Sequence, residues 1–126
     1  MLYTIRDILK SHPRLEGKFI GARYLAPQIG SIGILTEGTD KIVREYTDGN
    51  KIRLFPFMLA AVIPDGNSDR GEGYDYMQSF AEYLKEYKNQ GIIAFEQEGP
   101  PQIQKRSSAN SIYTVKLNCF YIISTE

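Results

Sequence analysis

The chain has 126 residues, of which 42% are hydrophobic and 12% aromatic, so it can build one hydrophobic core and is not of disordered composition. Fifteen lysines and arginines balance fifteen aspartates and glutamates, which excludes a net charge that would attract nucleic acid or an anionic membrane. The single cysteine, Cys119, excludes an intramolecular disulfide and a cysteine-based zinc finger. We therefore expect one soluble domain over residues 1–126, working in a reducing compartment.

The first fourteen residues predict a short amphipathic helix. Apolar residues recur at helical spacing from Leu2 to Leu9, Thr4 with Asp7 fits a capping box, and Pro13 prevents the helix from continuing. Charged side chains interrupt this segment, so it lacks the apolar core of a signal peptide.

Two β-rich regions follow the helix. Residues 17–25 carry apolar and aromatic side chains, and the Pro/Gly-containing stretch APQIGSIGIL after them predicts a short strand or an extended loop. Residues 41–46 and 51–63 flank Asp48-Gly49, which is the dipeptide most typical of a β-hairpin turn. Pro56 lacks an N–H, so we expect it at an edge position or a bulge and not in a regular central strand. The longest apolar stretch, 54–63, is about half the length of a membrane span.

The second half of the chain predicts a loop, a long helix and a second hairpin. Residues 64–73 are polar, and apolar residues at helical spacing from Met77 to Tyr87 follow them. The Gly-Pro-Pro segment after Phe95 predicts a break in regular structure. Residues 102–107 and 112–125 then predict two antiparallel strands, the last with apolar side chains on one face. The predicted fold is α+β: an antiparallel or mixed sheet with two helices packed on one face.

The residue types that carry catalysis or bind metals do not form a convincing site. His12 lies at a predicted helix end, and Cys119 lies on the apolar face of a strand, where a thiol packs as a small hydrophobic group. Acidic residues alternate in the 64–73 loop, but Arg70 and Tyr76 stand where an EF-hand needs Gly and Glu. We expect no catalytic residue, no cofactor and no metal, and interpret the chain as a structural assembly part and not an enzyme.

The segment Ile42–Phe57, together with the elements after it, resembles the phage minor capsid or tail-terminator-like proteins of tailed phages and prophages. That family typically shows an aromatic residue, then x-Asp-Gly, then an Arg followed by alternating Phe. The later elements MQSFAEYLKEYKNQG, IQKRS and YTVKLNCFYI follow in the family's order. The matching hairpin residues here are Tyr46, Asp48, Gly49, Arg53, Phe55 and Phe57.

The resemblance implies a ring, commonly hexameric, that caps the head-proximal end of the tail tube and joins it to the head connector or stopper protein. Such a protein belongs to the virion tail and assembles in the host cytoplasm. A closed ring requires two different contact patches on each subunit. The candidate interface residues are Tyr46, Asp48, Arg53, Phe55, Arg70, Glu72, Lys105 and Arg106.

Alternatives remain open at this point. Phe55 and Phe57 could point together into the core instead of forming an interface. Lys105 and Arg106 could form a solvated strand face, because two basic residues are too few for a nucleic-acid site. The protein could also be a head-side stopper or connector component, or a small ligand-binding α+β domain whose pocket is lined by tyrosines.

Overall fold

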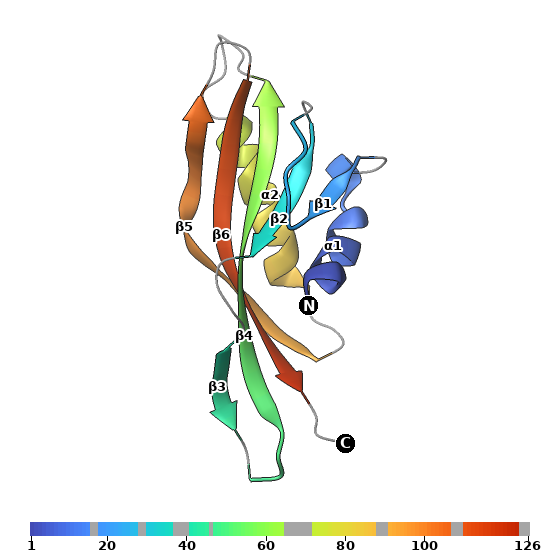
Figure 1. Ribbon diagram of the computed structural model, residues 1–126, viewed down its shortest axis with the longest axis vertical. Coiled ribbons are helices and arrows are strands. Elements are labelled where there is room, and N and C mark those ends of the chain that lie inside the picture. The colour runs from blue at the N-terminus through green and yellow to red at the C-terminus, as the bar shows by residue number, and fades with distance from the viewer. Residues whose placement is uncertain are drawn as a thin grey trace.

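The structure is a computed structural model that describes residues 1–15, 18–27, 30–36, 41–45, 47–64, 72–87, 91–106 and 110–123. Two α-helices, a 3₁₀ turn and six strands follow in the predicted order of helix, strands, hairpin, helix and hairpin (Figure 1). The elements are α1 (Leu2–Lys10), the 3₁₀ turn η1 (Pro13–Leu15), β1 (Ile20–Ala22), β2 (Ile32–Thr36), β3 (Lys41–Glu45), β4 (Lys51–Pro64), α2 (Glu72–Glu86), β5 (Ile92–Arg106) and β6 (Asn110–Ile123).

The strands form one mixed sheet in the order β1-β2-β4-β6-β5, and β3 pairs with β4 separately. The pair β1–β2 is parallel and the other pairs are antiparallel. The predicted hairpin around Asp48-Gly49 is confirmed as β3 and β4, and the predicted second hairpin is confirmed as β5 and β6. The α+β fold class with a mixed sheet is therefore confirmed.

The core lies between the sheet and the two helices, on what we call the helix face of the sheet. Strand residues alternate between the two faces, and the odd-numbered residues of β4 and β6 from Phe55 to Ala61 and from Tyr113 to Cys119 are buried. They join the apolar side of α1 and the buried residues of α2 in one cluster. We call the opposite side the open face.

The predicted capping box at the first helix is wrong. The helix α1 begins at Leu2, so Thr4 and Asp7 lie inside it, and no side chain caps its N-terminus. Leu2 and Ile5 are both buried against the core. Packing of the apolar stripe therefore sets the start of the helix, because burial of large side chains outweighs a single capping hydrogen bond.

Pro56 lies at a local edge of β4, as expected, but the expectation that the strand is not regular at this point is wrong. The pairing of β4 with β6 runs without a register shift through Pro56, opposite Asn118. On its other side, β4 pairs with β3 over residues 51–54 and with β2 over residues 57–61, so Pro56 lies between the two paired ranges. The N–H and C=O of Val62 bond toward the β2 side of β4. Because backbone groups alternate along a strand, the nitrogen of Pro56 faces the same side, where no strand pairs with it.

The predicted break after Phe95 is also wrong, because β5 continues through Gly99 and both following prolines to Arg106. The disturbance that these residues cause is a shift in register: Glu98 pairs with Lys116, but Gln102 already pairs with Thr114. Gly99 has a φ of 74°, which a glycine adopts without strain. The strand thus absorbs the Gly-Pro-Pro segment as a bulge instead of ending there.

A short segment between β1 and β2, residues 23–25, covers part of the open face, and we call it the strap. The chain turns at Arg23, whose φ is 71° and whose N–H donates to the carbonyl of Ile34. The carbonyl oxygen of Tyr24 then lies only 2.4 Å from where a Cβ of Gly21 would stand and 2.3 Å from that of Gly33. These two glycines are paired neighbours, so their missing side chains create the space that the strap occupies.

Candidate assembly surface

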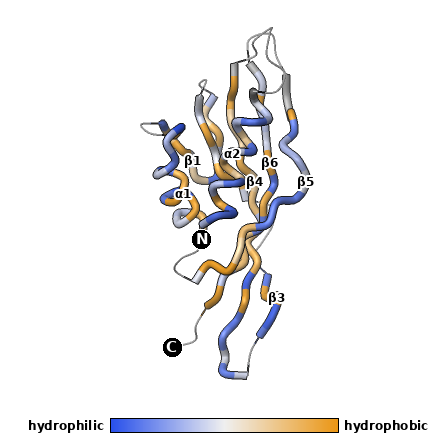
Figure 2. The backbone as a smooth tube through the Cα atoms, turned by 180° about the vertical axis from the view of Figure 1, so that it is seen from behind, coloured by the Kyte–Doolittle hydropathy of each residue, from blue (hydrophilic) through white to orange (hydrophobic). Residues whose placement is uncertain are grey.

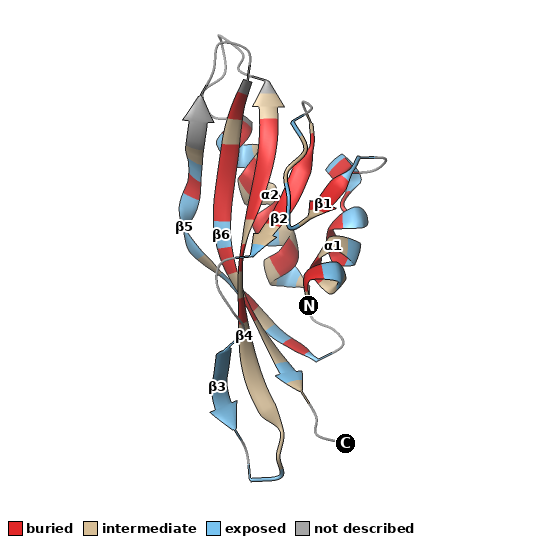
Figure 3. Ribbon diagram, viewed as in Figure 1, coloured by how far each residue is buried: buried red, intermediate tan, exposed pale blue. Residues whose placement is uncertain are grey.

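The sheet extends beyond its helices as an arm. We define the arm as β3, residues 47–56 of the hairpin and β4, residues 91–95 of β5 and residues 118–123 of β6. Figure 1 shows this part projecting away from α1 and α2, and we call the remainder the body. Figure 3 shows the change in burial along β4, whose upper half is buried and whose lower half is only partly covered.

The arm exposes large aliphatic side chains. Ile42 is 49% exposed, Val43 48%, Ile122 43% and Ile93 41%. Figure 2 shows hydrophobic segments where the strands cross below the helices, whereas the hairpin tip is hydrophilic. Ile42 and Ile122 lie on opposite faces of the sheet, because Ile42 pairs with Arg53 whereas Ile122 pairs with Ile52. Exposed aliphatic residues gathered in one part of a molecule favour a site of protein–protein contact over scattered exposure to water.

The open face of the arm adds further apolar side chains. The register places Leu54 beside Phe120 and Ala94, and Ile52 beside Ile122. These five residues are half-buried or exposed, although each lies in a strand with a neighbour on at least one side. Since the strap lies over β1 and β2, it does not extend to this part of the sheet.

Three candidate residues from the sequence lie on the arm. Asp48 sits in the hairpin turn, where its carboxylate accepts hydrogen bonds from the backbone N–H (3.0 Å) and the side-chain amide (3.2 Å) of Asn50. Arg53 is half-buried, and its Nε has no hydrogen-bond acceptor among the described residues. Phe55 is buried and stacks on Phe57 at 5.8 Å, so the core alternative holds for both rings and Phe55 adds no exposed surface.

The other candidates do not join this group. Glu72 begins α2, and Lys105 and Arg106 end β5, at the end of the molecule opposite the hairpin tip. Tyr46 and Arg70 lie outside the described residues. Among the described candidates, the structure therefore places Asp48 and Arg53 toward one end of an elongated molecule. Glu72, Lys105 and Arg106 lie toward the other end, so these candidates do not form one patch.

Sequence reasoning missed the exposed aliphatic residues of the arm. Ile42 and Val43 look like ordinary inward-facing hairpin residues, because a hairpin next to a polar loop is normally covered on one face. No pattern within residues 41–45 shows that the helices stop short of them. The relevant signal is the length of β4 and β6, at 14 residues each, against the 15-residue helix α2, which at a smaller rise per residue covers only part of them.

His12 is the one histidine and is placed in a structural role. Its ring meets the edges of Phe80 (5.0 Å) and Tyr83 (4.8 Å), and its Nδ1 accepts the N–H of Arg14 at 3.1 Å. Burial, and secondarily the charge of Arg14, hold the pKa of His12 below its ordinary value of 6.5. The imidazole is therefore mostly neutral at pH 7 and packs the turn after α1 against α2.

A chain of polar contacts joins α2 to the bend in β5. Lys85 contacts Glu82 at 3.2 Å, and Glu82 accepts a hydrogen bond from Gln78. Gln78 and Gln97 exchange two amide hydrogen bonds, at 3.0 and 2.8 Å, and Gln97 also donates to the carbonyl of Gly99. The hydrogen bonds from Gln78 and Lys85 lower the pKa of Glu82, which is exposed. This chain fixes the helix against the strand beside the bulge.

Eight of the nine tyrosines lie among the described residues, and these eight do not share one location. Tyr113 lies in the core, and Tyr76 and Tyr83 of α2 pack against the core. Tyr3 and Tyr24 are exposed on the surface. Arg14 and Lys18 both lie over the ring of Tyr76, at 5.8 and 5.6 Å. This contact stabilises the junction of η1 with α2.

No protein-family profile matches the chain. No curated protein sequence matches it at a significant level. In the described part of the chain, no three His, Cys, Asp or Glu side chains are grouped so that they could hold a metal ion. None of the described helices is both long enough and apolar enough to cross a membrane.

Proposed function

We propose that this chain is a structural protein of a tailed phage or prophage that caps the head-proximal end of the tail tube. It acts by self-association into a ring, and the ring offers surfaces to the tail tube and to the head connector. The observation that carries the proposal is the arm, because a folded chain that leaves Ile42, Val43 and Ile122 uncovered gains stability when a partner buries them.

The elongated shape supports two opposite docking ends. The arm lies at one end of the long axis, and the ends of β4 and β5 and the starts of α2 and β6 lie at the other (Figure 1). A ring whose axis follows the strands would present all its arms on one side and all these element ends on the other. Such a ring can join two different structures, which is the task of a head-to-tail joint.

A head-side stopper is the second candidate, and the same observation supports it. Both roles need a ring with two different faces, so the arm does not separate them. The partner that the ring binds distinguishes them: a terminator binds the tail tube, whereas a stopper binds the connector. Purified tube and connector proteins, tested separately for binding, decide between the two roles.

The first experiment is the solution mass of the purified chain by light scattering over a concentration series, with and without a polymerising tail-tube protein. We expect a closed oligomer, or a ring that forms on tubes and stops their growth. A chain that stays monomeric at every concentration and leaves tube growth unchanged would contradict the proposal. An oligomer that binds connector but not tubes would favour the stopper role.

A further inference from the structure

The two outer edges of the arm run in opposite directions. β3 is antiparallel to β4, β4 to β6 and β6 to β5, so β3 and β5 are antiparallel to each other. Each lies at an edge of the arm and pairs with one strand only among the strands described. Rotation about an axis to which the strands are inclined, as in a β-barrel, preserves the sense in which each strand runs along that axis. The strand β3 of one copy would therefore meet β5 of the next copy as an antiparallel neighbour.

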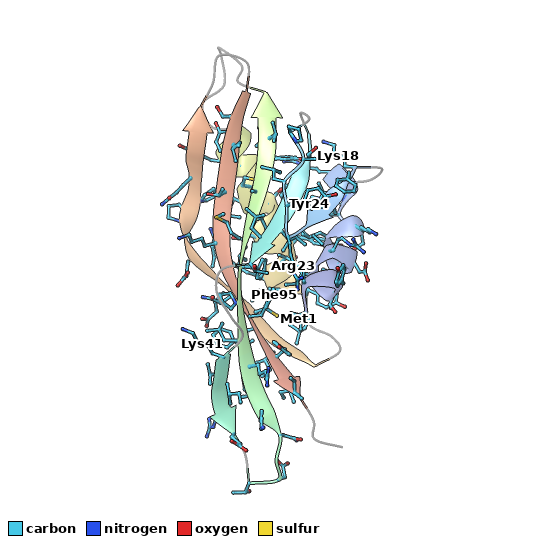
Figure 4. The ribbon with its side chains drawn as sticks, in the orientation of Figure 1. Met1, Lys18, Arg23, Tyr24, Lys41 and Phe95 are labelled. Carbon is cyan, nitrogen blue, oxygen red and sulfur yellow. The ribbon has the colours of Figure 1, made fainter. Side chains whose placement is uncertain are left out.

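The charges on these two edges are opposite. Lys41 and Arg44 of β3 are exposed, and Figure 4 shows Lys41 projecting from the arm. Glu96 and Glu98 of β5, which lie in the body directly beyond the arm, are exposed as well. The separation of basic from acidic residues holds on the open face, because the exposed Glu45 of β3 pairs with Lys51 and points to the other face of the sheet.

The bulge in β3 gives its two basic residues the same spacing as the acidic ones. Lys41 pairs with Leu54 and Arg44 with Ile52, so three steps along β3 match two along β4. Both basic residues therefore point to the open face. Glu96 and Glu98 are also two ladder steps apart and also point to the open face, opposite Asn118 and Lys116.

The same register matches the backbone groups. The N–H of Ile122 donates to the carbonyl of Gly91, so the even-numbered residues of β6 direct their backbone groups toward β5. Their partners Glu96 and Glu98 direct theirs toward β6. By alternation, the N–H and C=O of Phe95 and Gln97 point away from β6. On the other edge, the even-numbered residues of β4 direct their backbone groups toward β3, as Val62 does toward β2, and they pair with Lys41 and Arg44. The backbone N–H and C=O groups of Ile42 and Glu45 therefore point away from β4. With Lys41 opposite Glu98 and Arg44 opposite Glu96, Ile42 falls opposite Gln97 and Glu45 opposite Phe95.

We propose that β3 of one copy pairs with β5 of the next, with Lys41 opposite Glu98 and Arg44 opposite Glu96, so that β3 of each arm extends the sheet of the next copy at its β5 edge. This inference rests on the proposed function, since it specifies how the ring closes. The occupant of each edge is a second copy of this chain. Charge complementarity selects the partner edge and fixes the register, and backbone hydrogen bonds with burial of Ile42 hold the contact.

Charge reversal tests the pairing. Two double variants, K41E/R44E and E96K/E98K, each place like charges across every contact, and each should weaken self-association by about a hundredfold. When the two variants are mixed in equal amounts, every contact between unlike copies becomes complementary again. The mixture should therefore recover the oligomer as alternating copies. Unchanged circular dichroism and melting temperature of each variant serve as the folding control.

Cysteine cross-linking tests the register independently of charge. In a C119A background, R44C/E96C should form disulfide-linked multimers under oxidised glutathione. Within one chain the two positions are separated by three strand spacings, roughly 14 Å, which exceeds disulfide reach of about 7 Å. R44C/Q102C is the matched control, because Gln102 is exposed on the same strand but lies beyond the bulge. It should give no multimers.

The outcomes separate this inference from the proposed function. Recovery in the mixture together with cross-linking specific to R44C/E96C supports the pairing. A wild-type oligomer that both charge variants retain, and that R44C/E96C does not cross-link, overturns the pairing and leaves the ring proposal standing. A wild-type chain that is monomeric with and without tail tubes overturns both.

Discussion

The body and the arm are built on the same two strands, yet they differ in what covers them. In the body, β4 and β6 lie beneath the helices, and the strap covers the neighbouring strands β1 and β2 on the other face. In the arm the same strands continue without a register shift but lose the helix layer, and their side chains become half-buried or exposed over residues 51–54 and 120–123. Burial in this protein is therefore decided by the layer above the sheet and not by the strand itself.

The largest expected effect tests the body. Phe57 is fully buried and contacts Phe55 and Phe95 at ring distances of 5.8 and 6.2 Å. Phe57→Ala should lower the free energy of unfolding by about 3–5 kcal/mol, because it leaves a cavity among rings that cannot collapse into it. Urea denaturation followed by circular dichroism measures the change. A loss below about 1 kcal/mol would mean that the core is not closed at this position.

A smaller loss of folding stability should follow from filling the space beneath the strap. Gly33→Ala would place a Cβ 2.3 Å from the carbonyl oxygen of Tyr24, so the strap must shift, at an expected cost of about 1–3 kcal/mol in thermal or chemical unfolding. Adding Tyr24→Ala should not restore stability, since the obstructing atom belongs to the main chain. Restoration by that second change would show that the side chain, and not the backbone, sets the close approach.

Acidification should destabilise the body through His12. The pKa of His12 is below 6.5 in the folded chain, so the unfolded chain takes up its proton first as pH falls. Stability is fully present above about pH 6.5 and declines as pH falls through that value, by less than about 1.4 kcal/mol per pH unit for one proton. Melting temperatures between pH 7.5 and 5.5 measure the effect. His12→Asn, which keeps an acceptor near Nδ1 but does not titrate, should remove this component of the pH dependence, and its persistence would assign it to other groups.

The smallest effect on folding should come from the arm. Ile42→Ser with Ile122→Ser should change the stability of the monomer by no more than about 0.5 kcal/mol, because both side chains are largely exposed in it. The same variant should weaken self-association about tenfold, measured by light scattering, because the partner no longer buries these side chains. Tyr24→Ser, an exposed residue of the body in Figure 4, is the matched control and should leave association unchanged. A large loss of monomer stability in the double variant would show that the arm belongs to the folding core.

The sequence predicted those features that depend on local periodicity. The apolar alternation from Tyr113 to Cys119 gave the buried face of β6, and the spacing from Met77 onward gave α2. The dipeptide Asp48-Gly49 located the first hairpin, because its turn requires residues that tolerate positive φ, and Gly49 has a φ of 91°.

The features that the sequence did not predict depend on contacts between distant segments. Pro56 is accommodated in a long strand because β2 ends and β3 begins on either side of it, which no local pattern records. Gly33 looks like a strand breaker until the strap is seen to fill its space. The exposure of Ile42 likewise depends on where α2 ends. Fold class was thus accessible from the sequence, whereas the candidate surface required the three-dimensional arrangement.

The unbroken pairing of β4 with β6 makes the arm a lever. Fourteen consecutive registered pairs run from the hairpin to the far end of the body, with no shift at the boundary where the helices stop. A hinge would need a place where this ladder is interrupted, and the two strands contain none over the described pairs. A displacement or rotation of the hairpin tip on binding a partner is therefore transmitted through the whole sheet, and it also moves the opposite end of the molecule.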